Sequence, residues 1–242
     1  MTALVPNHST AFVTGGTSGI GAGVSRALAS AGWRVFAGSV SRSEIDAFEP
    51  MVGVFPLLVD VTDQASVDAA LQQVDGDLSG LVNCAGIIQR GGAEFDIDCF
   101  RQTLEVNLIG TMRVCLAAKK RFAPAGSAIV NIASMLSFFG SPVVPGYAAS
   151  KGGVVQLTKS LAAAWAAEGV RVNAVAPGWI ATPLTQALQD DKLRSASILE
   201  RTPQRRWGLP DEVGSAVLFL LSDSARFMTG AVVPVDGGYS AV

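Results

Sequence analysis

Histidine is almost absent from this chain of 242 residues, since His8 is the single one. Catalytic triads and multi-histidine metal sites both depend on well-placed imidazoles, so the composition argues strongly against them. We therefore expect no metal site. Any proton transfer must use other side chains.

Cysteine is also scarce, with only Cys84, Cys99 and Cys115. An odd number without a Cys-x-x-Cys pair argues against a disulfide framework or a zinc site. The N-terminal stretch lacks the basic and apolar regions of a signal peptide. No segment approaches the roughly 18 apolar residues of a membrane span. We therefore expect a cytoplasmic protein without a membrane partner.

Charge is low and balanced, because 18 basic and 20 acidic residues give a net charge of −2. No basic block could bind a phosphate backbone, so nucleic acid is not an expected partner. Hydrophobic residues make up 49% of the chain, and the mean hydropathy is +0.39. A parallel sheet buried on both faces would explain this, together with subunit interfaces that cover apolar surface.

Short β-rich runs alternate with longer helix-patterned stretches along the chain. The expected strands are 10–14, 34–38, 54–59, 80–83, 128–132, 171–175 and 231–235, and the expected helices cover about 19–31, 63–74, 98–122, 147–168 and 211–222. The alternation predicts right-handed βαβ crossovers and a parallel sheet in one α/β domain over 1–242. Long connections at 133–146 and 177–209 interrupt this rhythm, and we expect 177–209 to be a substrate lid.

A glycine turn follows the first expected strand, with Gly15, Gly19 and Gly21 in a G-x-x-x-G-x-G spacing. Without side chains, the backbone can approach a pyrophosphate, and the next helix offers free N–H groups and its dipole. Glycines also serve simple turns. The strand before this turn and the helix after it favour a dinucleotide site.

Tyr147 and Lys151 stand four residues apart, just over one helical turn, so they share one helix face. A free phenol titrates near pH 10, and a nearby ammonium favours its ionised form. Such a tyrosine can take a proton from an alcohol or return one to it. Taken alone, the spacing also fits a surface tyrosine and lysine.

Together with further segments, these motifs resemble the short-chain dehydrogenase/reductase family over nearly the whole chain. The similar segments are Thr-Gly-Gly-Thr-Ser-Gly-Ile-Gly at 14–21, Asp60-Val61, Asn-Cys-Ala-Gly at 83–86, Asn107, Ser134, Tyr147 with Lys151, Pro177-Gly178, Thr182 and Val-Asp-Gly-Gly at 235–238. The resemblance implies a single-domain Rossmann fold, with a seven-stranded, doubly wound parallel sheet flanked by helices. It also implies a homotetramer.

By this resemblance, Asn107, Ser134, Tyr147 and Lys151 form the catalytic set. Tyr147 is the acid/base, Lys151 lowers the pKa of its phenol and holds the nicotinamide ribose, and Ser134 hydrogen-bonds the substrate oxygen. Asn107 supports a water relay to the lysine. Because Asn is a poor helix former, a helix kink or a buried polar contact is also open for Asn107.

The resemblance further implies a nicotinamide dinucleotide. Asp60 would bond the adenine, with a helix cap as an open alternative, and Thr182 would hold the carboxamide. The implied cofactor contacts are Gly15, Thr17, Ser18, Gly19, Ile20, Gly21, Ser39, Arg42, Asp60, Val61, Asn83, Ala85, Gly86, Tyr147, Lys151, Pro177, Gly178, Ile180 and Thr182. Cys84 replaces an asparagine usual in the family, and we expect altered packing there without loss of binding.

The choice between NAD and NADP depends on the end of the second strand. NAD-dependent relatives often carry an acid where Ser39 falls, and NADP-dependent relatives often carry a base where Ser18 or Val40 falls. This chain has neither. Arg42 could reach a 2′-phosphate or face solvent. We expect NAD(H) rather than NADP(H), since the relatives that the substrate segments resemble often use it.

From Asn83 onward, the chain is most similar to the family's sugar-acid and polyol dehydrogenases, of the 2-deoxy-D-gluconate or 2-keto-3-deoxy-gluconate kind. Gln89 and Arg90 would meet a carboxylate or hydroxyls, with a solvated loop as the alternative. Apolar walls would come from Met135, Leu136, Phe139 and Trp179. The expected substrate contacts are Gln89, Arg90, Ser134, Leu136, Tyr147, Gly178 and Trp179.

We therefore expect an NAD(P)-dependent oxidoreductase that moves hydride between the nicotinamide and a secondary alcohol or ketone, on a keto-deoxy sugar acid or polyol. One alternative is an NADPH-dependent 3-oxoacyl thioester reductase, which would act on acetoacetyl thioesters. The other is a dinucleotide-sensing protein without catalysis. Such a protein should have a broken catalytic set, whereas all four residues are present.

Overall fold

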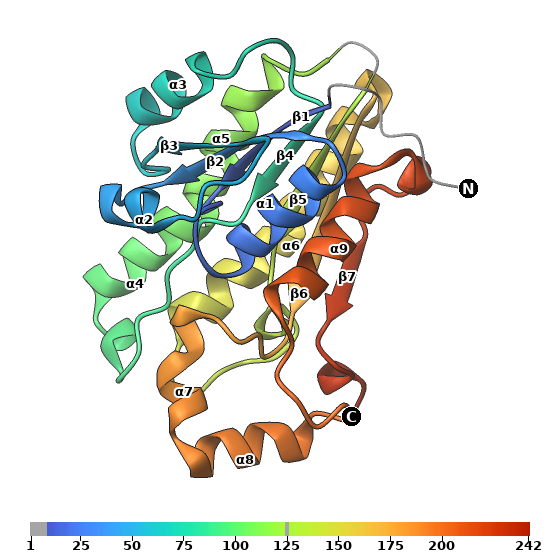
Figure 1. Ribbon diagram of the computed structural model, residues 1–242. Coiled ribbons are helices and arrows are strands. Elements are labelled where there is room, and N and C mark those ends of the chain that lie inside the picture. The colour runs from blue at the N-terminus through green and yellow to red at the C-terminus, as the bar shows by residue number, and fades with distance from the viewer. Residues whose placement is uncertain (1–8, 124–125) are drawn as a thin grey trace.

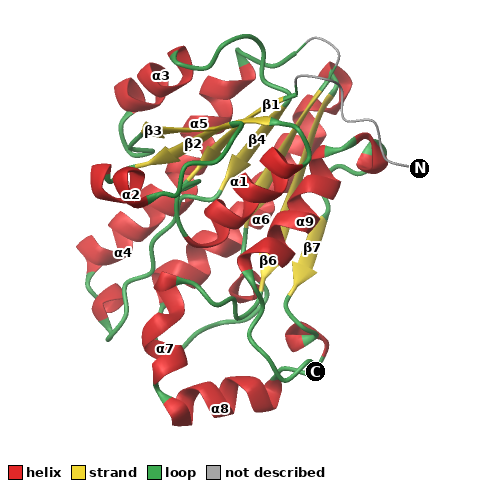
Figure 2. Cartoon of the chain, in the orientation of Figure 1, coloured by secondary structure: helices red, strands yellow, loops and turns green. Residues whose placement is uncertain are grey.

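The computed structural model describes residues 9–123 and 126–242, so His8 lies outside the described residues. A parallel sheet of seven strands has the order β3-β2-β1-β4-β5-β6-β7 (Figure 2). The strands are β1 (Thr10–Thr14), β2 (Arg34–Ser39), β3 (Val54–Leu58), β4 (Gly80–Asn83), β5 (Ser127–Ile132), β6 (Val170–Pro177) and β7 (Val232–Val235). The predicted doubly wound fold is confirmed. Its switch point lies between β1 and β4, where the strand order reverses.

Helices cover both faces of the sheet (Figure 1). On one face pack α1 (Gly19–Ser30) and α9 (Pro210–Leu221), and on the other pack α3 (Gln64–Gln72), α5 (Gly110–Lys119) and α6 (Pro145–Trp165). Successive strand residues serve opposite faces: Phe12 joins the core beneath α3, α5 and α6, while Ala11 and Val13 join the core beneath α1 and α9. Two buried faces account for the apolar composition.

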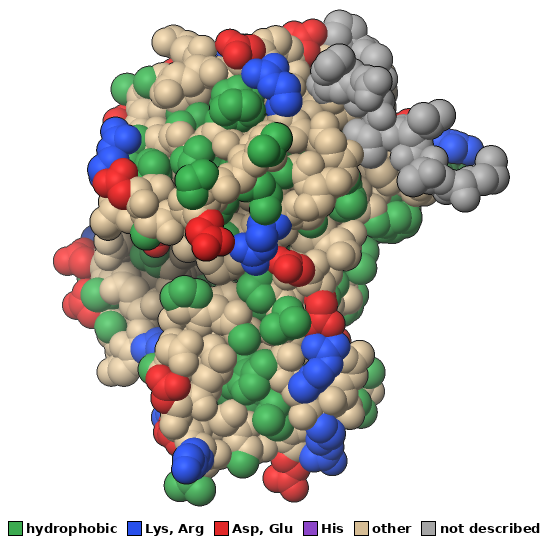
Figure 3. Space-filling model, viewed as in Figure 1, with side chains coloured by type: hydrophobic (Ala, Val, Ile, Leu, Met, Phe, Trp, Pro, Cys, Tyr) green, Lys and Arg blue, Asp and Glu red, His purple; other side chains and the backbone are tan. Residues whose placement is uncertain are grey.

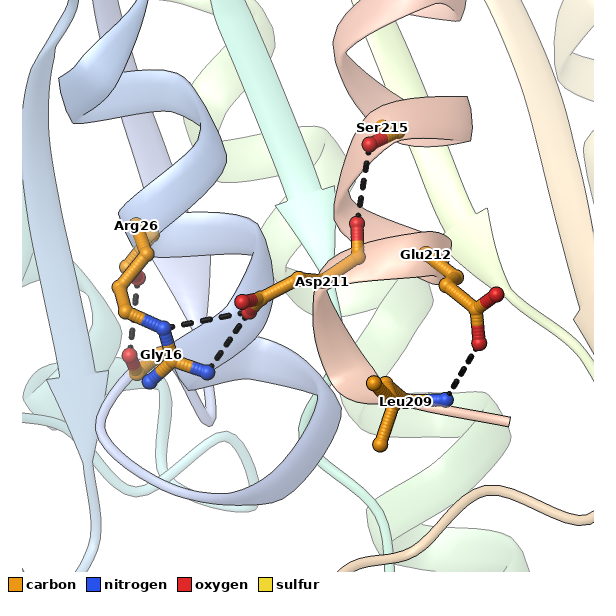
Figure 4. A network of polar contacts seen from close by, with 7 residues as sticks. Gly16, Arg26, Leu209, Asp211, Glu212 and Ser215 are labelled. Atoms are coloured by element: carbon orange, nitrogen blue, oxygen red, sulfur yellow. Dashed lines mark hydrogen bonds and ion pairs between the residues drawn. The ribbon is translucent and has the colours of Figure 1, made fainter. Parts of the chain in front are cut away.

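Glycines let α1 and α9 approach each other closely. A Cβ on Gly23 would come within 2.5 Å of the Pro210 carbonyl carbon, and one on Gly214 within 2.7 Å of the Gly23 oxygen. Across this contact Arg26 forms an ion pair with Asp211 at 2.7 Å (Figure 4). The start of α9 is therefore fixed against the helix that follows the glycine turn.

The single helix predicted over 98–122 is wrong in detail. The structure has α4 (Ile97–Leu104), a π-helical turn (Glu105–Ile109) and then α5. A π turn adds one residue to the helical repeat, and such insertions are frequent at functional sites. Asn107 lies in this turn.

The long loop predicted over 177–209 is also wrong in its local structure, because it contains α7 (Gln186–Asp190) and α8 (Lys192–Arg201). Asp191 caps α8 and accepts the N–H groups of Leu193 and Arg194, each at 3.1 Å. The sequence also misses α2 (Arg42–Ala47). Figure 1 shows α7 and α8 beyond the carboxyl ends of the strands.

The surface in Figure 3 carries Lys and Arg interspersed with Asp and Glu over the visible face. Among the residues that the structure describes, no helix has both the length and the apolarity to cross a membrane. Within the same residues, no group of three or more His, Cys, Asp and Glu side chains is placed to hold a metal ion.

Candidate active site

The four residues expected to be catalytic come together at the carboxyl end of the sheet. Ser134 follows β5, Tyr147 and Lys151 lie in the first turns of α6, and Asn107 comes from the π turn. The backbone of Gly86 runs between two of them. A Cβ there would lie 3.3 Å from Asn107 Oδ1 and 3.5 Å from Lys151 Nζ. The predicted grouping therefore exists as one cluster.

Tyr147 stands in the first turn of α6, which begins at Pro145, two residues before the predicted start. Proline suits this first position because its missing N–H would have no partner there. Burial raises the pKa of the Tyr147 phenol, while a hydrogen bond with Ser134 and the charge of Arg90 lower it. The sequence assigns this lowering to Lys151. In the structure Arg90 is the cation with that effect, and Lys151 Nζ lies 5.7 Å from the ring centroid.

Ser134 is held in place by the turn that follows it. Its Oγ accepts the N–H of Leu136 at 3.1 Å, and its own N–H donates to Ser137 Oγ at 3.2 Å. A serine hydroxyl has one donor hydrogen besides its acceptor lone pairs. The bond from the Leu136 amide uses a lone pair only, so the hydrogen can still donate. Leu136 thus shapes the site through its amide.

Lys151 is buried, and its Nζ donates to the carbonyl of Ile132 at 2.7 Å. Burial lowers its pKa to about 8, against a smaller raising effect from Cys84. Burial in turn raises the pKa of the Cys84 thiol to about 12. The substitution of cysteine for the family's asparagine therefore places a neutral thiol near the ammonium.

Asn107 is fully buried, and both ends of its amide are bonded. Its Oδ1 accepts the N–H of Ile87 at 2.8 Å, and its Nδ2 donates to the Ile87 carbonyl at 2.9 Å and to Ser150 Oγ at 3.0 Å. Both structural alternatives for Asn107 therefore hold: it lies in a helix irregularity and makes a buried polar contact. It fixes the segment after β4 against α6.

The glycine turn forms a cradle that side chains would fill. A Cβ on Gly21 would lie 1.9 Å from the Gly15 oxygen, and one on Gly15 would lie 3.0 Å from Ala85 N. Among the described residues, Thr17 Oγ1 is buried without a hydrogen-bond partner. Backbone amides of the turn, the N-terminus of α1 and a free hydroxyl suit a pyrophosphate.

The remaining residues that are predicted to contact the cofactor lie along the same edge of the sheet. Ser18 precedes α1, Ile20 lies within it, and Gly178 and Ile180 follow β6, which ends at Pro177. Thr182 reaches the glycine turn, since a Cβ on Gly19 would lie 3.5 Å from its side chain. Asn83 donates to Asn131 Oδ1 at 2.9 Å, and its own Oδ1 is buried without a partner in the described chain.

Asp60 is not the helix cap that the sequence allows, because Asp63 caps α3 by accepting the N–H of Ala65. One oxygen of Asp60 accepts both the N–H and the hydroxyl of Thr62, at 2.8 and 2.7 Å. Within the described residues the other carboxylate oxygen accepts no hydrogen bond, which is compatible with the predicted contact to the adenine. Next to it, Val61 is buried against Gly110.

Sequence reasoning missed an acid at the end of β2. Ser39 is buried and donates to Glu44 Oε2 at 2.7 Å. Glu44 lies on α2, where Ser41 is the N-cap, and Arg42 is the first residue of this helix and is exposed. A serine followed three residues later by glutamate is a helix-start signal that could have revealed this arrangement.

Gln89 and Arg90 differ in what they contact. The Gln89 side chain donates to the Cys99 carbonyl at 2.9 Å and to Gln102 Oε1 at 3.2 Å, which speaks against its predicted substrate contact. Arg90 donates to the Leu184 carbonyl at 3.4 Å. Partial burial lowers the pKa of Arg90, and its charge interacts with that of Tyr147. Arg90 therefore stands between the phenol and residues 177–209.

Trp179 contributes to an aromatic cluster at the base of 177–209. Its ring meets Trp207 and Tyr239 edge-on, with centroids 6.0 and 6.3 Å apart. It also lines a cavity of about 310 Å³ with Gln204 and Asp236. The predicted wall residue thus lies where 177–209 meets the C-terminal segment.

Comparison with known proteins gives the family. A family model described as enoyl-(acyl carrier protein) reductase matches residues 15–240. The chain is 38% identical over 238 residues to 2-dehydro-3-deoxy-D-gluconate 5-dehydrogenase of Bacillus subtilis, covering 95% of this chain and 94% of the relative. It is 41% identical over 242 residues to cis-4-hydroxycyclohexanecarboxylate dehydrogenase of Sinomonas cyclohexanicum, covering 96% of each. The chain belongs to the short-chain dehydrogenase/reductase family.

This membership makes the chain an NAD(P)-dependent oxidoreductase acting on CH–OH groups, as the sequence predicts. A solved relative in this short-chain dehydrogenase/reductase family is gluconate 5-dehydrogenase from Burkholderia cenocepacia J2315, in complex with NADP and tartrate. It has a TM-score of 0.88 at 33% identity and covers 97% of this chain and 96% of its own. Its NADP gives no support to the predicted preference for NAD.

Proposed function

We propose that this enzyme oxidises a secondary alcohol of a hydroxy acid, of the sugar-acid kind, to the ketone, or reduces that ketone. The observation that carries this proposal is Arg90, whose guanidinium donates to the Leu184 carbonyl of 177–209 and whose charge lowers the pKa of the Tyr147 phenol. A guanidinium at the mouth of the site can pair with a carboxylate through two hydrogen bonds. The carboxylate would then hold the substrate while its distant carbinol meets Tyr147.

The two curated relatives support a fixed spacing between these groups. In 2-dehydro-3-deoxy-D-gluconate the reacting carbon is C5, and in cis-4-hydroxycyclohexanecarboxylate it is C4 of the ring. Three carbons separate the carboxyl carbon from the carbinol carbon in both names. A chain and a ring thus share the same number of intervening carbons, and the open chain can adopt the carboxylate-to-carbinol distance that the ring imposes. We assign the same spacing to the substrate of this enzyme.

The chain's own residues supply the proton chemistry. During oxidation, the ionised Tyr147 takes the proton of the substrate hydroxyl, and Ser134 donates a hydrogen bond to the same oxygen. Lys151 keeps donors free beside Ile132 for the nicotinamide ribose. Asn107 holds the backbone that borders them, and we retain its role in supporting a water relay.

The nicotinamide coenzyme, when bound, accepts or delivers the hydride. The cradle at Gly15 to Gly21, with Thr17, would hold its pyrophosphate, and Asp60 would bond the adenine. The segment from Asn83 to Gly86 would border the adenosine ribose. Thr182, which already contacts the glycine turn, would hold the carboxamide.

We propose that NAD(H) is preferred, because Glu44 supplies the acid that position 39 lacks. Its carboxylate is bonded to Ser39 at the end of β2, where an acid would accept ribose hydroxyls and repel a 2′-phosphate. Arg42, the first residue of the same helix, would have the opposite effect, because its positive charge could attract the 2′-phosphate of NADP.

Residues 177–209 are proposed as the substrate lid. They contact the glycine turn through Thr182 and the substrate side through the Leu184 carbonyl. A pair of hydrogen bonds closes their base, from Gly208 N to the Trp179 carbonyl and from Ala181 N to the Gly208 carbonyl, both 2.9 Å. Because these bonds hold the two ends of 177–209 together, the residues between them can cover the substrate and exclude water.

We also propose a cytoplasmic homotetramer. Ile109 and Leu116 are 46% and 49% exposed on one side of the fold, and Phe219 of α9 is 44% exposed beside the edge strand β7. A second copy would cover such apolar side chains. Light scattering on the purified protein would measure its mass directly.

The acyl thioester alternative is favoured by the description of the matching family model, which names an acyl carrier protein substrate. A spectrophotometric panel separates the two functions. Hydroxy acids with different spacings, neutral polyols and acetoacetyl thioesters are each tested with both coenzymes. If only acetoacetyl thioesters are turned over, and only with NADPH, the hydroxy-acid proposal is wrong and the enzyme is a 3-oxoacyl thioester reductase.

A further inference from the structure

A buried carboxylate outside the expected catalytic set joins two walls of this site. Glu94 is only 1% exposed. Its Oε1 accepts the N–H of Gln89 at 2.9 Å, and its Oε2 accepts the N–H of Tyr147 at 2.8 Å. A buried carboxylate is costly unless hydrogen bonds satisfy it. Both oxygens here are bonded to backbone amides, and these belong to separate segments.

The start of α6 is built to receive this carboxylate. First-turn amides of a helix have no partner within it, and the helix dipole favours negative charge at that end. Pro145 presents no N–H of its own. Gly146 permits close approach, because a Cβ there would lie 3.3 Å from Glu94 Oε2. The helix stabilises the charge, and the charge fixes the backbone that carries the phenol.

We propose that Glu94 is a positioning residue that sets the distance between the Tyr147 phenol and the Arg90 guanidinium. Gln89, which Glu94 holds, directly precedes Arg90 in the chain. One carboxylate thus fixes the backbone at the group that meets the carbinol and at the group that meets the substrate carboxylate. The inference rests on the proposed function. If Glu94 fixes Arg90 relative to Tyr147, it also decides which substrates have the right spacing between carboxylate and carbinol.

Charge supplies a second readout. The Glu94 carboxylate raises the pKa of the Tyr147 phenol. The other charged or titratable groups facing this phenol are Arg90, Cys84 and Lys151, and Glu94→Gln changes the chemistry of none of these side chains. Neutralising Glu94 should therefore lower the pKa of Tyr147. Oxidation requires the ionised phenol, so the rate of oxidation falls at acidic pH. In Glu94→Gln this acidic limb of the pH–rate profile should move to lower pH.

Glu94→Gln is the main test, because it keeps the size of the side chain but turns an amide N–H₂ toward one backbone N–H. We expect kcat/KM for the best hydroxy acid to fall roughly tenfold or more, since small displacements of reacting groups are costly. The loss for a neutral polyol should be smaller. The acidic limb of the pH profile should shift downward.

Glu94→Asp separates geometry from charge. The shorter side chain cannot reach both amides but stays ionised, so acid selectivity should fall, while the acidic limb of the pH profile should lie at higher pH than in Glu94→Gln. Asp96→Asn is the matched control: Asp96 caps α4 by accepting the N–H groups of Asp98 and Cys99, at 3.0 and 3.2 Å. It removes a carboxylate but keeps the cap, since asparagine caps a helix as well as aspartate does, so Tm, selectivity and the acidic limb should all stay near the wild-type values.

A measurement without substrate keeps the inference apart from the proposed function. The chain has 2 tyrosines, so a Tyr239→Phe background leaves Tyr147 alone, and its ionisation can be followed by ultraviolet absorbance. Adding Glu94→Gln should lower that midpoint. If Glu94→Gln only lowers Tm, with selectivity, pH limb and midpoint unchanged, Glu94 is merely structural. If wild type turns over no hydroxy acid, the proposed function fails, whatever the midpoint does.

Discussion

The hydroxyl of Ser39 donates to the carboxylate of Glu44 across 2.7 Å at the end of β2, where the coenzyme's adenosine ribose is expected. Glu44 lies five residues beyond the position at which an acid is usually sought. Because α2 begins immediately after the strand, the chain turns back and returns the acid to the same place. In the proposed preference for NAD(H), this pair takes the place of the missing acidic residue.

Glu44→Gln should move the coenzyme preference toward NADP. Removing a negative charge beside the 2′ position relieves repulsion of the phosphate, and we expect the NADP-to-NAD ratio of kcat/KM to rise about tenfold, the equivalent of roughly 1.4 kcal/mol. Initial rates with both coenzymes measure the ratio. Asp46→Asn, on the same helix and exposed, is the control. An unchanged ratio in Glu44→Gln would remove this residue from coenzyme selection.

Tyr147→Phe should abolish turnover and leave coenzyme binding intact. General acid/base catalysis typically contributes about 10²–10⁴-fold, so kcat should fall by at least roughly a hundredfold. The ring remains to fill its place beside Ser134. Initial rates and titration of coenzyme binding by protein fluorescence measure the two effects. A variant with near wild-type kcat would show that another group transfers the proton.

The lowered pKa of buried Lys151 predicts that the free energy of unfolding rises with pH. Its pKa is about 8 in the folded protein against 10.5 ordinarily, so between these values the unfolded chain binds more protons, and unfolding becomes less favourable as pH rises. Below pH 8 both states are protonated and the contribution of Lys151 is constant. Urea unfolding of wild type and Lys151→Met at several pH values isolates this effect. The wild-type minus variant difference should increase from about pH 8 to 10, by a few kcal/mol at most. A flat or falling difference would contradict it.

Gly214→Ala should destabilise the protein although alanine is the better helix former. The new Cβ would meet the Gly23 oxygen at 2.7 Å, and overpacking of this kind costs about 1–3 kcal/mol. Gly140→Ala is the control, because nothing lies within 4 Å of its added Cβ. Thermal unfolding should show a lower Tm for the first variant only. Equal Tm values would mean that α9 can move away from α1 at little cost.

Much of the fold is predictable from the sequence, because strand alternation and glycine turns are local signals. The same holds for the catalytic cluster, whose members carry recognisable motifs. Contacts between distant segments carry no such signal. From the sequence, Gln89 looks like a substrate-binding residue, but in the structure its side chain is bonded to α4. Glu94 looks like an ordinary acidic loop residue, but it accepts the Tyr147 N–H of α6. The helix α8 is missed because its sequence is polar overall and buries no residue, and its cap at Asp191 is the local clue.

The π turn at Glu105–Ile109 also constrains the chain length that this segment can have. Deleting one residue between Leu104 and Gly110 would let α4 continue into α5 as an uninterrupted helix, but it would rotate one half against the other by about 100°. Either Asn107 would leave Ile87, or Val114 and Cys115 would leave the core that they now share. A shortened chain would therefore have a more regular helix and a poorer site, so this stretch should tolerate substitutions far better than single-residue deletions.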